Sequence, residues 1–295
     1  MSMRKQFVQT VSHLLATDER VVLLLGDIGV FGFRDAFQAF PTRVYNIGIL
    51  EQATVSLAAG LAKTGLIPIV HTIAPFLVER CLEQIKIDFG YQALGGNFVS
   101  VGASYDYAAL GCTHHCPGDV QVMTSIPGIE VAVPGSAREF DSLLRATYAS
   151  PKPTYFRLSE TENPTSPGVD FARAALVRQG RAATIVAVGP TLPAVMEASE
   201  GLDVSILYYS TVAPFDAAML RDHRSSGKIL LCEPYYRGGL AAEITEALWP
   251  DPVLLRCAGV PRRFLANYGR MAEHDAAIGL TAATLRREME LLLDA

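Results

Sequence analysis

The stretch YNIGILEQATVSLAAGLAKTGLIPIVHT, residues 45–72, contains the pattern that decides the fold. A helical pattern of small and apolar residues around 51–64 leads into the apolar run IPIVHT at 67–72. Continuous apolar runs of this length are typical of strands that are covered on both faces. Glu51 lies at the junction of a strand and the following helix, which is where open α/β sheets place groups that bind ligands.

The same alternation of strand and helix continues on both sides of this stretch. An amphipathic helix is expected near the start of the chain, and further helices around 75–88 and 136–149. Apolar runs that predict strands occupy residues 21–27, 97–103, 129–135 and 154–159. Strands that alternate with helices in this way predict a doubly wound α/β sheet. The first domain is therefore assigned to residues 1–165.

A second α/β domain follows a break in the pattern. Residues 160–180 are rich in turn-forming and polar residues, and we interpret 166–180 as a linker. The alternation then resumes, with strands predicted at 183–189, 203–211, 228–234 and 253–260 and a helix at the end of the chain. The second domain is assigned to residues 181–295, so that the fold class is α/β with two doubly wound sheets.

Composition narrows the function. Of the 295 residues, 50% are hydrophobic and 19% are charged, and the net charge is -5. An acidic chain offers no electrostatic footprint for nucleic acid. No apolar run approaches the roughly 18–20 residues that a membrane span needs, and no signal-peptide core is recognisable. The five cysteines are odd in number and scattered, which favours a reduced, cytoplasmic setting.

Residues 45–72 resemble the pyrimidine-binding domain of transketolases, of 1-deoxyxylulose-5-phosphate synthases and of 2-oxoacid dehydrogenase β-subunits. In these proteins a strand ending in N-x-G-I-x-E-Q precedes a helix of small residues and a G-x-x-P-I-V strand. The stretch THHCPGDVQVM at 113–123 resembles a transketolase loop and helix, and EPYYRGGLAAEITEAL at 233–248 is similar to the glycine-pair helix of transketolase C-terminal domains. Essentially the whole chain is covered. It resembles the C-terminal subunit of a split transketolase.

The resemblance assigns Glu51 to the activation of thiamine diphosphate. In the family a shielded carboxylate holds a proton at N1′ of the pyrimidine and favours the 4′-imino tautomer, whose nitrogen removes the proton from C2 of the thiazolium. The alternative for a lone glutamate is that it only stabilises the helix dipole from the first turn. The motif on both sides of Glu51 favours the catalytic interpretation.

A second subunit is implied by what the sequence lacks. The cofactor's diphosphate and Mg²⁺ need a G-D-G motif with a downstream Asn pair, and no such motif is found. A separate diphosphate-binding subunit is therefore expected, most simply in an α2β2 heterotetramer with sites between subunits. The resemblance places Asp27, in GDIGVFG at 26–32, on the thiazolium side of the cofactor. The alternative for Asp27 is a helix N-cap.

Further cofactor contacts are expected in HTIAPFLVER at 71–80. In the family an aromatic ring from this segment stacks on the aminopyrimidine. Phe76 is the choice, and a slip of one residue in the alignment would put Leu77 there instead. Phe76 as part of the hydrophobic core is the alternative. Arg80 resembles an arginine of the synthases, and it can also be a partner in an interface ion pair.

Two histidines are candidates for proton transfer. The resemblance places His114 where a histidine contacts the substrate carbonyl or hydroxyl, and the adjacent His115 is able to share this task. Because neighbouring loop residues point in different directions, only one is expected to be essential. The segment CTHHC at 112–116 also contains possible zinc ligands, including Cys112 and Cys116. Four ligands within five residues fit a tetrahedral ion poorly, so no metal is assigned to this chain.

Three positions depart from sugar-phosphate transketolases. Where these carry a phosphate-binding histidine and arginine, this chain has Gly102 and Glu160, and a glutamate repels a phosphate dianion. Where they carry an aspartate that meets a sugar hydroxyl, this chain has Leu110. Arg157 remains, either facing the site or serving the fold. The sequence thus favours a non-phosphorylated or more apolar acceptor over an ordinary pentose phosphate.

Three competing functions stay open at the level of sequence. A 2-oxoacid dehydrogenase β-subunit shares the two-domain plan and the need for a partner, although the loop THHCPGD with its Asp119 favours a transketolase. A non-catalytic assembly partner is a second alternative, against which the presence of Glu51 and His114 argues. Dinucleotide binding is disfavoured because no G-x-G-x-x-G follows a strand, and YRGGLAAE at 236–243 has only a glycine pair.

Overall fold

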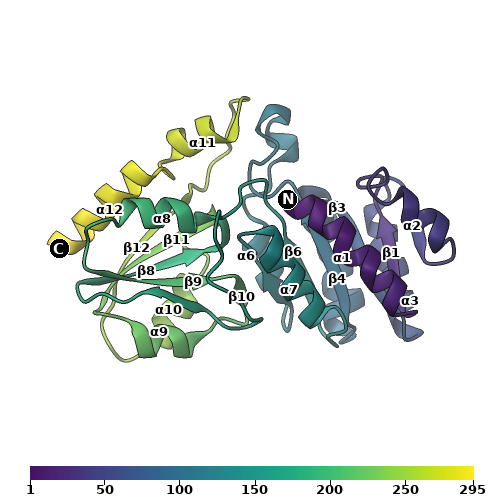
Figure 1. Cartoon of the computed structure of the whole chain (residues 1–295), viewed down its shortest axis with the longest axis horizontal. Coiled ribbons are helices and arrows are strands. Elements are labelled where there is room, and N and C mark those ends of the chain that lie inside the picture. Colours follow the sequence, from purple (N-terminus) through teal and green to yellow (C-terminus); the bar gives the residue numbers. More distant parts are fainter.

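A computed structural model describes residues 1–295, which form two α/β domains placed side by side (Figure 1). The first domain contains a seven-stranded sheet in the order β10-β5-β6-β4-β3-β1-β2. Its strands are β1 Val21–Leu25, β2 Val44–Asn46, β3 Ile67–Ile73, β4 Gly96–Val101, β5 Glu130–Ala132, β6 Pro153–Arg157 and β10 Thr211–Ala213. All neighbouring strands are parallel except β10, which runs antiparallel to β5.

Helices cover both faces of this sheet. Strand β1 shows the reason: its five residues are all buried, and they alternate between two apolar clusters on opposite faces. One face packs against α1, α2 and α7, and the other against α3, α4 and α6. These helices are α1 Met3–Thr17, α2 Arg34–Ala39, α3 Glu51–Lys63, α4 Ala74–Val78, α6 Asp119–Thr124 and α7 Ala137–Thr147.

The second domain repeats the plan with a five-stranded sheet in the order β12-β11-β8-β9-β7. Helices α8 and α12 pack on one face of this sheet, and α9 and α10 pack on the other. Its strands are β7 Ala175–Arg178, β8 Ala183–Val188, β9 Val204–Tyr209, β11 Lys228–Tyr236 and β12 Leu254–Val260. Its helices are α8 Leu192–Ala198, α9 Ala217–His223, α10 Ala241–Ala247, α11 Met271–Ile278 and α12 Ala282–Asp294.

The fold class is confirmed as α/β, but both sheets are mixed rather than wholly parallel. Part of the range predicted as a linker, 166–180, forms β7, which pairs antiparallel with β9. Strand β10 leaves the second half of the chain to join the first sheet. Together with β2 these are edge strands of three or four residues. Such short segments lack the continuous apolar run that reveals a central strand.

The helix predicted at 75–88 is interrupted. Helix α4 ends at Val78, and a short helix α5 at Leu82–Gln84 leads into a π-helix at Ile85–Tyr91. Two charged side chains at the interruption bind residues of other segments. Glu79 Oε1 accepts a weak hydrogen bond from Cys116 Sγ, and Arg80 Nη1 donates a hydrogen bond to Glu51 Oε1. The break therefore brings Arg80 to the start of α3.

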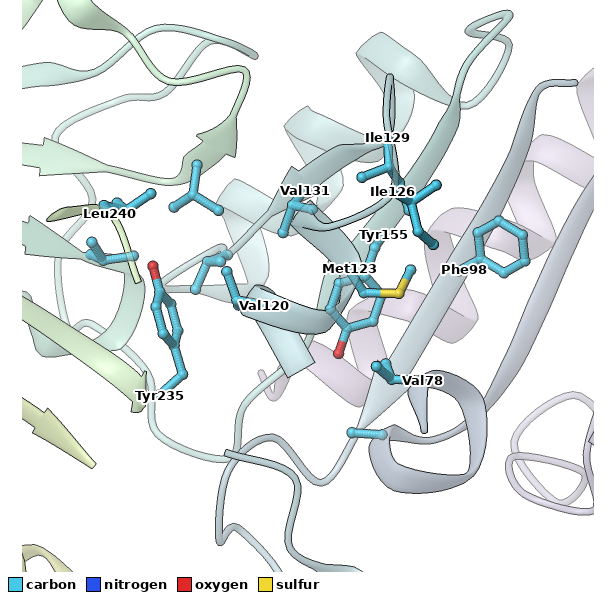
Figure 2. Packing of buried hydrophobic residues seen from close by; sticks show 14 of the residues in the cluster. Val78, Phe98, Val120, Met123, Ile126, Ile129, Val131, Tyr155, Tyr235 and Leu240 are labelled. Atoms are coloured by element: carbon cyan, nitrogen blue, oxygen red, sulfur yellow. The ribbon is translucent and has the colours of Figure 1, made fainter. Parts of the chain in front are cut away.

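The two domains share one hydrophobic core (Figure 2). Val131 of β5 and Val120 of α6 belong to the same buried cluster as Tyr235 of β11 and Leu240. Figure 2 shows these side chains in one continuous layer between the domains. Near the boundary predicted at residue 165 the chain thus passes from one sheet to the other, while the two sheets remain joined by a shared hydrophobic cluster. No helix of the structure combines the length and the apolar character that crossing a bilayer requires.

Candidate functional site

Glu51 is the first residue of α3 and is 5% exposed. Its Oε1 accepts a hydrogen bond from Arg80 Nη1 at 2.8 Å, and the same atoms form an ion pair. Glutamates are rarely this buried unless they are paired. A glutamate that only stabilised the helix dipole would gain nothing from burial. The burial of Glu51 therefore favours a role for its carboxylate beyond capping the helix.

Phe76 lies beside this ion pair. The Arg80 guanidinium carbon is 3.9 Å from the centroid of the Phe76 ring, which is a close cation–π contact. The His114 ring meets Phe76 edge-on, with centroids 5.4 Å apart at 66°. Leu77 is fully buried in the core. Of the two candidates for stacking, only Phe76 is in the same cluster as Glu51, Arg80 and His114.

Asp27 follows β1 and forms a reciprocal pair with Asn46 at the end of β2. Its backbone N–H donates to Asn46 Oδ1 at 3.0 Å, and Asn46 Nδ2 donates to Asp27 Oδ1 at 3.1 Å. Asp27 adopts a φ of 64°, in the left-handed region that aspartate tolerates better than most residues. The helix N-cap alternative is wrong, because α2 begins only at Arg34. Asn46, which the sequence motif contained but did not single out, holds Asp27 in place.

The two adjacent histidines have different surroundings. His114 is half-buried, and its Nδ1 shares a hydrogen bond with Thr113 Oγ1 at 3.0 Å. His115 is buried, has no hydrogen bond at either ring nitrogen and packs edge-on against His274 of α11, 5.5 Å away. Burial lowers the pKa of His115. The structure therefore places only His114 beside Phe76, whereas His115 faces the second domain.

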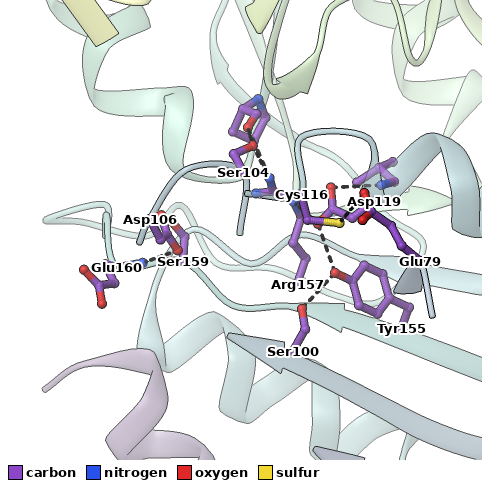
Figure 3. A network of polar contacts seen from close by, with 12 residues as sticks. Glu79, Ser100, Ser104, Asp106, Cys116, Asp119, Tyr155, Arg157, Ser159 and Glu160 are labelled. Carbon is purple, nitrogen blue, oxygen red and sulfur yellow. Dashed lines mark hydrogen bonds and ion pairs between the residues drawn. The ribbon is translucent and has the colours of Figure 1, made fainter. Parts of the chain in front are cut away.

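Arg157 serves the fold (Figure 3). It is 1% exposed, and its Nε donates to Asp119 Oδ2 at 2.8 Å. Its Nη2 donates to Ser104 Oγ at 2.6 Å and to the Pro234 carbonyl at 3.2 Å. The Tyr155 hydroxyl also donates to Asp119 Oδ2. This network joins the loop after β4, helix α6 and strands β6 and β11. Both Nε and Nη2 of Arg157 are thus hydrogen-bonded to other groups of the protein.

The possible zinc ligands do not converge. Cys112 is exposed, whereas Cys116 is buried and donates to Glu79. Nowhere in residues 1–295 do three or more His, Cys, Asp or Glu side chains adopt an arrangement that fits a metal ion. The side chains of the segment CTHHC therefore contact different parts of the protein and do not surround a common point.

The three positions that depart from sugar-phosphate transketolases provide no cation. Gly102 has a φ of 75°, and a Cβ atom there would lie 2.7 Å from the Tyr107 ring. Leu110 is 51% exposed. Glu160 is exposed as well, and its backbone N–H donates to Asp106 Oδ2 at 3.0 Å. These positions therefore cannot bind an anion in the manner expected of a histidine and an arginine.

Asp106 makes the stability of the chain depend on pH. Burial raises its pKa to about 7, although Arg157 and the hydrogen bonds from Glu160 and Ser159 act in the opposite direction. An unfolded aspartate has a pKa of about 3.9. Between these two values the folded state keeps a proton that the unfolded state has lost. The stabilisation is thus complete below about pH 4 and is lost as the pH rises to about 7.

Replacing Asp106 by Asn is therefore expected to remove the contribution of this carboxyl group to the pH dependence of the free energy of unfolding. Between pH 5 and 7 the free energy of unfolding of the parent chain should fall by about 1.4 kcal/mol per pH unit more than that of Asp106→Asn. Urea denaturation at pH 5, 6 and 7 measures the difference. Asp35→Asn, at an exposed side chain, is the matched control and should follow the parent. Parallel curves for Asp106→Asn and the parent would contradict the expectation.

Comparison with known proteins finds two family models that match successive parts of the chain. Residues 1–165 match the family model described as transketolase, pyrimidine binding domain. Residues 172–284 match the model described as transketolase, C-terminal domain. The buried Glu51 and its neighbours Phe76, Arg80 and His114 all lie within the first match.

Individual relatives cover nearly the whole chain. An uncharacterised 33.6 kDa protein in the fasciation locus of Rhodococcoides fascians is 40% identical, over 97% of this chain and 93% of that protein. One subunit of the apulose-4-phosphate transketolase of Phocaeicola vulgatus is 31% identical, over 88% of this chain and 87% of that protein. A solved split-gene transketolase, described as an inactive β4 tetramer, superimposes with a TM-score of 0.86 at 26% identity. The match covers 100% of this chain and 98% of that chain.

Proposed function

The chain belongs to the transketolase family, and on that premise we propose that it is the β-type subunit of a two-component enzyme that uses thiamine diphosphate. In the proposed reaction a two-carbon ketol or acyl unit passes from a ketose or 2-oxo donor to an aldehyde or ketone acceptor. The observation that carries the proposal is Glu51, a carboxylate buried at the start of α3 and hydrogen-bonded to Arg80.

The residues around Glu51 fit an aminopyrimidine ring. Only Oε1 of Glu51 takes part in a hydrogen bond within the chain, which leaves Oε2 for a protonated ring nitrogen. Arg80 covers one face of Phe76, so we propose that the pyrimidine stacks on the other face. When bound, thiamine diphosphate supplies the reactive carbon through which carbon–carbon bonds are broken and made.

Each remaining residue of the cluster has a proposed task. Glu51 holds a proton at the pyrimidine nitrogen, from a shielded position where it exchanges that proton with the ring rather than with water. His114 has no hydrogen bond at Nε2 within the chain, so that this atom is available to exchange a proton with a substrate oxygen. Asp27, fixed by Asn46, faces the thiazolium side of the cofactor. Arg80 keeps the Glu51 carboxylate in place.

A partner subunit completes the proposed site. Large apolar side chains are exposed around Glu51, and such surfaces mark protein interfaces when they gather in one region. They are Ile49 and Leu50 before α3, Leu57 on α3, and Ile87 and Tyr91 on the π-helix. The P. vulgatus relative is itself named as one subunit of a transketolase. We propose an α2β2 heterotetramer whose other subunit holds the diphosphate and Mg²⁺.

The direct test of this function is cofactor binding with and without the partner. The chain by itself should not bind thiamine diphosphate and Mg²⁺ tightly, because its described residues offer no metal-binding group of three ligands. Binding should appear when the chain is co-expressed with a diphosphate-binding subunit encoded nearby. Calorimetry on the chain, the partner and the complex distinguishes these cases. Tight binding and turnover by the chain alone would refute the split-enzyme proposal.

The same complex tests the substrate. Because Gly102, Leu110 and Glu160 provide no cation, we propose that the acceptor is not an ordinary pentose phosphate bound in the usual way. Hydroxypyruvate with D-glyceraldehyde should therefore be used at least as efficiently as xylulose 5-phosphate with ribose 5-phosphate. A clear preference for the two pentose phosphates would overturn this part of the proposal. The 2-oxoacid dehydrogenase alternative is not favoured, since both domain matches are to transketolase models.

A further inference from the structure

His114 is carried by the long loop between β4 and α6, residues 102–118. Regular structure in this loop is limited to two single turns of 3₁₀-helix, Ala108–Leu110 and Cys112–His114. The loop is closed at its base, where the Cys116 N–H donates to the Ser104 carbonyl at 2.7 Å. Single helical turns are not stable by themselves. The direction of the His114 side chain therefore depends on the surfaces against which the loop packs.

The second domain provides one of these surfaces, and Tyr105 is the main contact. The Tyr105 hydroxyl donates a hydrogen bond to Asp275 Oδ1 of α11 at 2.5 Å. The Tyr105 ring is 4% exposed and belongs to a cluster of buried side chains with Val260 and Leu265. Its centroid lies 5.3 Å from that of His274, which is also on α11. Tyr105 thus binds the second domain through both its ring and its hydroxyl group.

Two further contacts lie on either side of the turn that carries His114. After the turn, the buried ring of His115 packs edge-on against His274, with centroids 5.5 Å apart. Before the turn, a Cβ atom at Gly111 would lie 2.6 Å from the Tyr268 ring, so this ring lies directly against the Gly111 backbone. Residues of the second domain therefore contact the loop both before and after His114.

We propose that α11 positions His114 from the second domain, with Asp275 and its partner Tyr105 as positioning residues. The inference rests on the proposed function, because it gives the second domain a part in the proton transfer that we assign to His114. Apolar contacts have no preferred direction, whereas a hydrogen bond weakens steeply when its angle changes. The hydrogen bond to Asp275 therefore fixes the orientation of the loop more narrowly than the burial of the Tyr105 ring does.

Three substitutions test the hydrogen bond from both of its ends. Tyr105→Phe keeps the ring in its cluster and removes the donor, and Asp275→Ala removes the acceptor. Because a displacement of about 1 Å can cost an enzyme about a hundredfold, and other contacts still hold the loop, each should lower kcat/KM about tenfold. Asp275→Asn keeps an oxygen that accepts from Tyr105, so it should retain most of the activity.

The matched control is Tyr148→Phe. The Tyr148 hydroxyl donates to Asp18 Oδ2 at 3.2 Å, so this change also removes a hydrogen bond between a tyrosine and an aspartate. Tyr148 lies at the end of α7 and Asp18 at the end of α1, outside the loop that carries His114. The control should therefore leave kcat/KM unchanged.

The decisive experiment repeats Tyr105→Phe in a complex that already carries His114→Ala, with hydroxypyruvate as donor and D-glyceraldehyde as acceptor. If α11 acts through His114, the additional fall in kcat/KM should be less than about twofold, because the effects of coupled residues are not additive. Hydrogen–deuterium exchange at the reactive carbon of the cofactor depends on Glu51 and should be unchanged by Tyr105→Phe.

A measurement on the chain itself, without substrate, gives an independent readout. Exchange of the backbone amide hydrogens in residues 107–115 reports how often the loop opens. This exchange should become faster in Tyr105→Phe and in Asp275→Ala, and it should stay near that of the parent in Asp275→Asn. Unaltered exchange in both Tyr105→Phe and Asp275→Ala would contradict the inference.

The outcomes separate this inference from the function on which it rests. An unchanged kcat/KM in Tyr105→Phe, in a complex whose turnover falls on His114→Ala, would overturn the inference alone. An equal fall with and without His114 would also refute it, because the loss would then follow from a general disturbance of the fold. A complex that transfers no two-carbon unit to any acceptor would remove the proposed function and this inference with it.

Discussion

Turnover by the assembled enzyme is expected to fall about a thousandfold when Glu51 is replaced by Gln. Positioned proton-transfer groups contribute about 10²–10⁴ to enzymatic rates. The glutamine keeps the size of the side chain and an oxygen for Arg80, but it cannot take up and return a proton at the pyrimidine nitrogen. Steady-state turnover, together with hydrogen–deuterium exchange at the reactive carbon of the cofactor, measures the loss. Both rates should fall together, since both depend on this proton.

The matched control for this experiment is Glu19→Gln. Glu19 is an exposed carboxylate in the turn between α1 and β1, and the same chemical change there should leave both rates unaltered. Circular dichroism should show that each variant is folded. If Glu51→Gln retains most of the turnover in a complex that binds the cofactor, the chain acts as an assembly partner and its carboxylate is not catalytic.

Asp119→Asn is expected to destabilise the chain by about 3–5 kcal/mol, the usual cost of removing one partner of a buried ion pair. Asp119 is fully buried, and it provides the only negative charge that contacts Arg157 at hydrogen-bond distance. Asparagine has nearly the same shape and can still accept from the Tyr155 hydroxyl. The loss therefore measures the charge of Arg157 left uncompensated in the interior. The midpoint of urea denaturation at constant pH reports it.

Two further variants show whether charge is the cause. Combining Asp119→Asn with Arg157→Met should recover part of the lost stability, because the double variant buries no net charge. Arg181→Met, which removes the exposed ion pair with Asp203, should cost less than about 1 kcal/mol. A cost for Asp119→Asn as small as that of Arg181→Met would mean that the charges of the buried network do not compensate one another.

The central strands could be predicted because their signal is local. A strand covered on both faces is mostly apolar, and β1, β3, β4, β8 and β9 show this with runs of five to seven residues that are buried at nearly every position. The edge strands could not be predicted in this way. Strand β7, within the expected linker, has no fully buried residue. Its place in the sheet depends on pairing with β9, which lies more than twenty residues further along the chain.

The residues of the candidate site also divide into those that the sequence indicates and those that only the fold reveals. The motif around Glu51 and the resemblance that it carries are enough to indicate Glu51, Phe76 and His114. Burial is what favours Phe76 over Leu77, because a one-residue shift on a helix turns a side chain by about 100°, and here it separates a partly exposed ring from a fully buried side chain. The pairing of Glu51 with Arg80 likewise depends on a break after α4, which the expected continuous helix did not contain.

By itself the sequence determined the α/β class and the two-domain plan, and it singled out Glu51 as the carboxylate that we propose holds the proton, because apolar runs and the residues around Glu51 are properties of adjacent positions. Only the tertiary structure decided that Arg157 is enclosed with Asp119, that His115 faces His274, and that Nε2 of His71 lacks a donor. These are contacts between distant segments. Whether a buried polar group is satisfied depends on which atoms the fold brings to it, and no local pattern contains that information.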